Sequence, residues 1–260
     1  IRHVLCAMAA DENEHLFRDM MSYRFEGSKD IGGHNLGNLI FLSLMDITGS
    51  FMGAIQAISR ILKVKGTILP STLDTVTLYA MMEDGTLVRG ENNIPTLNNS
   101  IDHVFYQKRV EPQRDALKAI RKADLIIYGI GSLYTSIMPN LIIPEIVDEI
   151  KRNPCQKIYF CNAMSQPGET DDFSVEDHIR AIEKHSFKNA VDLAIVNDSY
   201  IPQNILEAYA KQGSYPVKIK EHEHSYRIIV RKLIMFDEKG RIRHNPDAVK
   251  KVIEEVIQTI

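Results

Sequence analysis

The sequence predicts an α/β fold with a mainly parallel sheet, and three apolar segments carry that prediction. Residues 125–128, 157–161 and 191–196 each have the length of a strand and are rich in aliphatic or aromatic residues. Apolar runs of this length are typical of parallel strands, which are buried on both faces. Stretches with apolar residues at helical spacing lie between them. This alternation indicates strand–helix–strand units.

The composition is that of an ordinary globular protein and argues against several functional classes. Hydrophobic residues make up 44% and charged residues 25% of the 260 residues, both near globular averages. The net charge of −3 argues against a general nucleic-acid or membrane-surface protein, which needs an excess of Lys and Arg. No apolar run approaches the roughly 18 residues of a membrane span, and we find no signal peptide. Three cysteines (Cys6, Cys155, Cys161) without metal-ligand spacing indicate a reducing compartment, so we expect a cytoplasmic protein.

The first 110 residues are expected to hold helices followed by an antiparallel insertion. A glycine-rich loop leads into an apolar helix near residues 39–45, and Ser50 is placed to cap the helix after it. From about residue 64 the helical period is lost, and Asp84-Gly85 is a hairpin-turn signal. The strands that we expect here are 67–70, 76–81, 86–88 and 101–110.

Helix-capping residues and turn residues divide the rest of the chain into helices and strands. Asn140 is expected to cap a helix over residues 141–150. Ser174 and Asp177 form a weak capping box, because Asp stands where Glu or Gln is usual. Further on we expect a helix with Ile205, Leu206 and Tyr209, one strand over 228–235, a turn at 237–240 and a helix over 246–260.

A glycine turn follows directly on the first parallel strand. Gly129 and Gly131 let the backbone turn sharply and approach a ligand closely. Ser132 and Thr135 then offer hydroxyls at the expected start of a helix, where free N–H groups and the helix dipole favour an anion. This pattern predicts a phosphate-bearing ligand at the carboxyl end of a parallel strand. Glycine placed for turn geometry alone explains the same residues, because a lone GxG motif is weak.

Asparagine follows the next two strands, at Asn162 and Asn197, and the loop after Asn162 contains Gln166. Side chains at strand ends are presented to a ligand in this architecture, although Asn after a strand also commonly satisfies a turn. In the early glycine-rich loop, His34 and Asn38 are equally well explained as a second wall of the site or as a local helix entry.

Three segments in order resemble one known family. They are GIGSLYTSIMPNLIIPEI (129–146), CNAMSQPGET (161–170) and GHNLGNL (33–39), and they are similar to the CofD-like superfamily in its bacterial gluconeogenesis-factor branch. The resemblance covers nearly the whole chain. It implies a Rossmann-like, doubly wound α/β fold with a mainly parallel sheet, in a single domain over residues 1–260 with a β insertion at about 64–110.

Two departures from the family pattern stand out. The family begins with a strand and a glycine phosphate loop, whereas this sequence opens at Ile1-Arg2, which looks like a later segment. The resemblance therefore implies that the first strand is missing from the sequence. Ile130 and Ser165 replace the usual Pro and Thr, and neither change removes a hydroxyl or a backbone donor.

The resemblance implies two functions of different classes. Proteins of this branch are thought to bind UDP-N-acetylglucosamine without catalysis and to influence central carbon metabolism, cell-wall synthesis and cell shape. The other branch contains transferases that move a phospholactyl group from a nucleotide diphosphate donor onto a deazaflavin precursor with Mg²⁺. The neutral amides of Asn162 and Asn197 suit uracil, ribose or sugar hydroxyls better than Mg²⁺, which favours the first reading. We expect a UDP-sugar or dinucleotide ligand and no required cofactor; Mg²⁺ and a homo-oligomer remain compatible with the resemblance.

The expected ligand contacts combine the motif residues with two residues raised by the resemblance. Tyr209 is placed to stack on a base or to bond a ribose hydroxyl, and Arg243, beside His244, to neutralise phosphate charge. The alternative to a ligand role is equally good: Arg243 is then a solvated residue at a strand end, and Tyr209 is a half-buried aromatic residue of a helix. No catalytic or metal-binding residue is predicted. The predicted site residues are Gly129, Gly131, Ser132, Leu133, Tyr134, Asn162, Gln166, Asn197, His34, Asn38, Tyr209 and Arg243.

Overall fold

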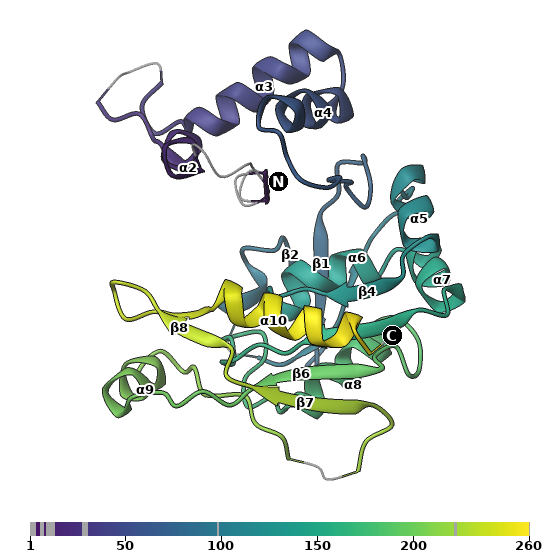
Figure 1. Cartoon of the computed structure of the whole chain (residues 1–260), viewed down its shortest axis with the longest axis vertical. Helices are drawn as coiled ribbons and strands as arrows, with labels where there is room; N and C mark the ends of the chain where they lie inside the picture. Colours follow the sequence, from purple (N-terminus) through teal and green to yellow (C-terminus); the bar gives the residue numbers. More distant parts are fainter. Residues whose placement is uncertain are drawn as a thin grey trace. The chain divides into compact units, whose positions relative to one another are not determined.

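The computed structural model describes residues 4–5, 8, 14–27, 31–97, 99–220 and 223–259, so Ile1, Arg2 and Cys6 lie outside the described residues. The chain divides into two compact units, Ile1–Leu73 and Asp74–Ile260 (Figure 1). The single domain over residues 1–260 stays a prediction.

The first unit is helical. It contains α2 (Glu14–Ser22), α3 (Leu36–Thr48) and α4 (Phe51–Ile61). Ser50 caps α4 as predicted, because its Oγ accepts a hydrogen bond from the Gly53 N–H at 3.0 Å. Within the described residues no single helix is long and apolar enough to cross a membrane, and only α3 and α4 together, across a 115° bend, reach that length and composition.

Residues 67–70 form no strand, so that prediction was wrong. Pro70 has no N–H to donate to a sheet ladder. Ile68 instead packs against the helical core of Leu5, Met21 and Ile58. The apolar character of this segment therefore reflects helix packing and not a sheet.

The second unit begins with the antiparallel sheet that was predicted as an insertion. Its strands are β1 (Leu78–Met82), β2 (Leu87–Arg89) and β3 (Ile101–Tyr106), in the order β2-β1-β3. The hairpin turn at Asp84-Gly85 is confirmed: Gly85 has a φ of 85°, and the Asp84 carboxylate accepts from the Thr86 N–H at 2.9 Å. A short 3₁₀ turn, Ile94–Thr96, follows β2.

The main sheet has four parallel strands, which confirms the predicted fold class. They are β4 (Leu125–Tyr128), β5 (Gln156–Phe160), β6 (Leu193–Asn197) and β7 (Arg227–Arg231), in that order. Its helices are α5 (Arg114–Arg121), α6 (Met138–Leu141), α7 (Pro144–Arg152), α8 (Val175–His185), α9 (Gln203–Ala210) and α10 (Pro246–Ile257).

Apolar side chains cover both faces of this sheet. Tyr159 and Ala194 pack in one core with residues of α7 and α8, whereas Phe160 and Ile195 pack with Val252 of α10 in another. Adjacent residues of a strand point to opposite faces, so each of these strands contributes to both cores. This two-sided burial explains why the strands are apolar throughout.

The predicted single strand over residues 228–235 is two strands. The chain leaves the parallel sheet after Arg231, and β8 (Ile234–Phe236) pairs antiparallel with β9 (Ile242–His244). Between them the fully buried Leu233 donates its N–H to Asn197 Oδ1 at 3.0 Å. This bond and the burial of Leu233 direct the chain away from β7.

Asn140 does not cap the helix that follows it. It lies inside α6 and donates from Nδ2 to the Ser136 carbonyl at 2.9 Å. Helix α7 begins at Pro144, after Ile143 in an extended conformation (φ −94°, ψ 110°). A residue before proline is disfavoured in the helical region, so the proline and not the asparagine decides where this helix starts.

The capping box at the start of α8 is complete, and it yields a stability prediction. Ser174 Oγ accepts from the Asp177 N–H, and the Ser174 N–H donates to Asp177 Oδ2 at 2.7 Å. Ser174→Ala should lower the free energy of unfolding in urea by about 1 kcal/mol, and Ser174→Gly by only a few tenths. Equal stability of the alanine variant and the unchanged protein would contradict this role.

Candidate functional site

A pocket of about 550 Å³ lies at the carboxyl ends of β4 and β5. Six of the predicted site residues line it: Gly131, Ser132, Asn162, Gln166, Tyr209 and Arg243. Other lining residues were not predicted, and they include Pro95, Ile130, Met164, Ser165, Glu169, Ser214, Ile242 and His244. The lining comes from five separate parts of the second unit. Local sequence patterns therefore indicate only some of its members.

The glycine turn after β4 is held by the two predicted amide side chains. Asn162 Nδ2 donates to the Gly131 carbonyl at 3.0 Å, and Gln166 Nε2 donates to Ser132 Oγ at 2.8 Å. A Cβ added at Gly131 would lie 3.2 Å from Ser136 Cβ, so packing within the turn already favours glycine there. At Gly129 no atom lies within 4 Å of such a Cβ, so packing does not explain that glycine.

The hydrogen-bond donors predicted for a ligand phosphate are in contact with a carboxylate of the chain itself. Glu169 accepts from Ser132 Oγ at 3.2 Å, from Thr135 Oγ1 at 3.1 Å and from the Tyr134 N–H at 3.3 Å. Glu169 is buried, with only 6% of its surface exposed. Burial raises the pKa of Glu169, and the hydrogen bonds from Thr135 and Ser132 oppose that shift.

The side chains of Leu133 and Tyr134 point into the core, and neither residue lines the pocket. Leu133 is fully buried, and the Tyr134 ring packs edge-on against Phe173 and His185. Burial raises the pKa of the Tyr134 hydroxyl above its ordinary value. These two residues begin a π-helical turn, Leu133–Ile137.

The β8–β9 hairpin supplies the basic side of the pocket. The Tyr209 hydroxyl accepts from the Ile242 N–H at 2.8 Å and so holds β9 in place. Arg243 Nε is 3.8 Å from Asp237 Oδ2, whereas Arg241 Nε bonds the same oxygen at 2.7 Å. Asp237 therefore pairs mainly with Arg241, and its contact with Arg243 is longer.

His244 carries an unsatisfied nitrogen in the wall of the pocket. Its Nε2 is buried and has no hydrogen-bond partner among the residues that the structure describes. Burial lowers the pKa of His244, which favours the neutral ring. A buried polar atom without a partner is unusual in proteins.

Gly129 and three further predicted residues also do not line this pocket. Asn197 Oδ1 accepts from Ser199 Oγ at 2.7 Å and from the Leu233 N–H at 3.0 Å, which ties the end of β6 to the residue just before β8. His34 and Asn38 are exposed residues of the first unit. A ligand role for these four residues stays a prediction.

The described residues contain no group of three or more His, Cys, Asp or Glu side chains arranged to hold a metal ion. Among the pocket-lining residues of the described chain, Glu169 carries the only carboxylate.

The comparisons with known proteins decide the family. The family model described as 2-phospho-L-lactate transferase CofD matches residues 1–234. The chain belongs to the CofD family. It is 38% identical to the protein named gluconeogenesis factor of Halalkalibacterium halodurans over 258 residues, which cover 98% of this chain and 80% of that protein. It is also 38% identical to the gluconeogenesis factor of Bacillus subtilis over 261 residues, covering 99% and 82% of the two chains.

A solved structure agrees with this assignment. The crystal structure of a Bacillus halodurans protein is similar with a TM-score of 0.91 at 38% identity, over 97% of this chain and 81% of that one. The predicted resemblance to the gluconeogenesis-factor branch of the CofD family is therefore confirmed, and this CofD-family chain spans about four fifths of these relatives.

The state of Glu169 leads to a pH prediction. Its raised pKa means that the folded state keeps the proton to higher pH than the unfolded state does. The resulting stability is present below the ordinary carboxyl pKa of 4.5 and is lost as pH rises through the raised value. The unfolding free energy of the unchanged protein minus that of Glu169→Gln should therefore fall as pH rises from below 4.5.

Glu149 provides a control of opposite sign for urea unfolding at several pH values. A hydrogen bond from Arg121, at 2.6 Å, lowers the pKa of Glu149. The same difference for Glu149→Gln should therefore rise with pH. A difference for Glu169→Gln that stays constant or rises with pH would contradict a buried carboxylate with a raised pKa.

Proposed function

We propose that this CofD-family chain binds a nucleotide sugar, UDP-N-acetylglucosamine, in the pocket at β4 and β5, and acts as a non-catalytic regulator of central carbon metabolism, cell-wall synthesis and cell shape. The observation that carries the proposal is the lining of one pocket by Ser132, Asn162 and Gln166 together with Arg243. The name gluconeogenesis factor of the relatives supports a role in carbon metabolism. The odd cysteine count supports a cytoplasmic place of action.

The charges of the pocket suggest an orientation for the ligand. Arg243 offers a planar fork for the diphosphate, and the unsatisfied His244 Nε2 lies in the same wall. Glu169 is an acceptor for hydroxyl groups and repels phosphate. We therefore place the diphosphate at the β8–β9 hairpin and the sugar or ribose hydroxyls at Glu169, Gln166 and Asn162. In this orientation Gly131 lies in the wall of the site beneath the hydroxyls, and Gly129, Leu133 and Tyr134 belong to the same turn behind it.

The second candidate is a transferase that moves a phospholactyl-like group onto a deazaflavin precursor with Mg²⁺. The description of the matching family model favours it. Mg²⁺ is usually held by one or two carboxylates together with substrate phosphates. Glu169, the carboxylate in the described lining, already accepts three hydrogen bonds. This donor set fits sugar and ribose hydroxyls better than Mg²⁺, so we rank the transferase second.

Isothermal titration of the full chain with UDP-N-acetylglucosamine, with and without Mg²⁺, separates the two candidates. Binding without consumption of the ligand supports the regulator. Absence of binding at millimolar ligand removes it. Transfer of a phospholactyl group to a deazaflavin acceptor, measured by mass spectrometry in parallel, would establish the transferase instead.

Arg243→Ala tests the phosphate end of the pocket. A hydrogen bond to a charged group contributes about 1.5–3 kcal/mol, so the variant should bind UDP-N-acetylglucosamine roughly ten- to hundredfold more weakly. The loss should be larger at low salt than at high salt, because salt screens the charge. Titrations at two ionic strengths measure both effects.

Arg152→Ala is the matched control, because it removes the same charge at a different place. Arg152 is the last residue of α7 and precedes the amino end of β5, whereas the pocket lies at the carboxyl end of that strand. The Arg152→Ala variant should bind UDP-N-acetylglucosamine with the same affinity as the unchanged protein. An equal loss for Arg243→Ala at both salt concentrations would mean that Arg243 acts through packing.

A further inference from the structure

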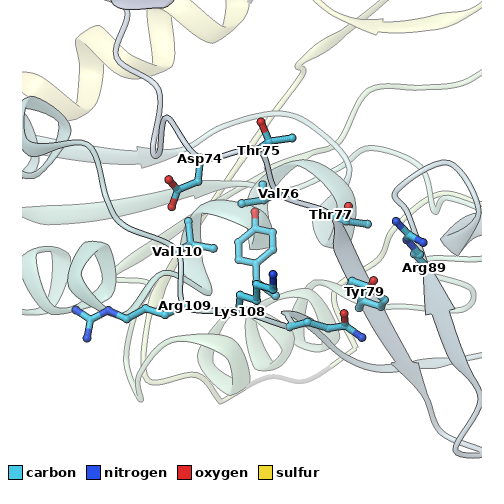
Figure 2. Close-up of a pocket in the computed structure, with 11 residues that line it drawn as sticks. Asp74, Thr75, Val76, Thr77, Tyr79, Arg89, Lys108, Arg109 and Val110 are labelled. Atoms are coloured by element: carbon cyan, nitrogen blue, oxygen red, sulfur yellow. The ribbon is translucent and has the colours of Figure 1, made fainter.

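A second opening lies in the antiparallel sheet, where two paired strands separate. The β1–β3 ladder begins at the pair Leu78↔Tyr106. Beyond this pair, residues 74–77 and 107–110 diverge around a pocket of about 470 Å³. Figure 2 shows the first segment along one side of the pocket, Lys108 to Val110 along the other, and Tyr79 and Arg89 toward one end.

The two diverging segments leave their backbone groups available. Within the described residues, the backbone N–H and C=O groups of residues 75–77 and 107–109 take part in no backbone hydrogen bond. The side chains of Thr75, Thr77 and Gln107 likewise have no hydrogen-bond partner among the described residues. A ligand between the segments would therefore meet hydrogen-bond donors from both walls.

The charge of this opening is positive in a chain of net charge −3. The ionisable residues that line it, tyrosines aside, are Asp74, Arg89, Lys108 and Arg109, three bases and one acid. Arg109 is ion-paired with Glu111 at 3.1 Å and with Glu145 at 2.6 Å. Arg89 and Lys108, in contrast, have no ion-pair partner among the described residues.

We infer that this opening is a second binding site, for a small polyanionic metabolite held by Arg89, Lys108 and the donors of residues 75–77 and 107–109. The volume is that of a small-molecule site. Guanidinium and ammonium groups together with hydroxyl, amide and N–H donors match phosphate or carboxylate oxygens. Tyr79, stacked on Phe105 with ring centroids 5.9 Å apart, provides a flat apolar surface beside the charges.

This site is separate from the pocket at the parallel sheet. The two pockets share no lining residue. The inference therefore does not depend on the proposed function, and the two stand or fall by different experiments.

The test is calorimetric titration of the full chain with pyrophosphate and, separately, with citrate. Saturable binding of either anion is expected, and a preference between them distinguishes a phosphate ester from a polycarboxylate as the natural ligand. The double variant Arg89→Gln, Lys108→Gln should weaken binding on the order of tenfold or more. Both side chains are exposed, so the variant should keep its melting temperature.

A charge-matched double variant, Lys188→Gln with Lys232→Gln, removes two exposed cations elsewhere and should bind as the unchanged protein does. Failure of both anions to bind at millimolar concentration overturns the inference. Binding that is unchanged by Arg89→Gln, Lys108→Gln also overturns it. So does binding that is lost only with Arg243→Ala, because it places the anion in the other pocket.

Discussion

The candidate site depends on one buried carboxylate. Glu169 joins the turn after β4 to the loop after β5 through Ser132, Thr135 and the Tyr134 N–H. These contacts link residues more than thirty positions apart in the sequence. A buried carboxylate is unfavourable unless its oxygens accept hydrogen bonds, so the turn and the loop must take up compatible conformations together. The shape of the pocket floor follows from that requirement.

The same carboxylate changes what the glycine turn can bind. A strand, a glycine turn and hydroxyl side chains normally suggest a phosphate site. Here the donors of the turn already have an anionic acceptor within the protein. In the proposed binding mode the ligand phosphate therefore lies near Arg243, on the hairpin that follows the parallel sheet. The pocket thus combines a polar floor around Glu169 with a basic wall from a distant part of the chain.

The antiparallel insertion also takes part in the pocket. Pro95, in the turn after β2, lines it and packs closely against the loop that carries Glu169. Gly168 in that loop has a φ of 76°, and a Cβ there would lie 2.1 Å from the Pro95 carbonyl oxygen. No other residue fits this contact without movement of the backbone. The insertion therefore supports the Glu169 loop in addition to carrying its own opening.

The sequence by itself determined the features that depend on neighbouring residues. The parallel strands β4, β5 and β6, the Asp84-Gly85 turn and the Ser174 capping box follow from local periodicity and backbone preference. The family, too, was recognisable from three motifs. Only the tertiary structure decided the features that depend on distant partners: the end of β7 set by Leu233 and Asn197, and the pairing of Glu169 with the turn. Burial and long-range hydrogen bonds have no local pattern, because the chain must fold before the partners meet.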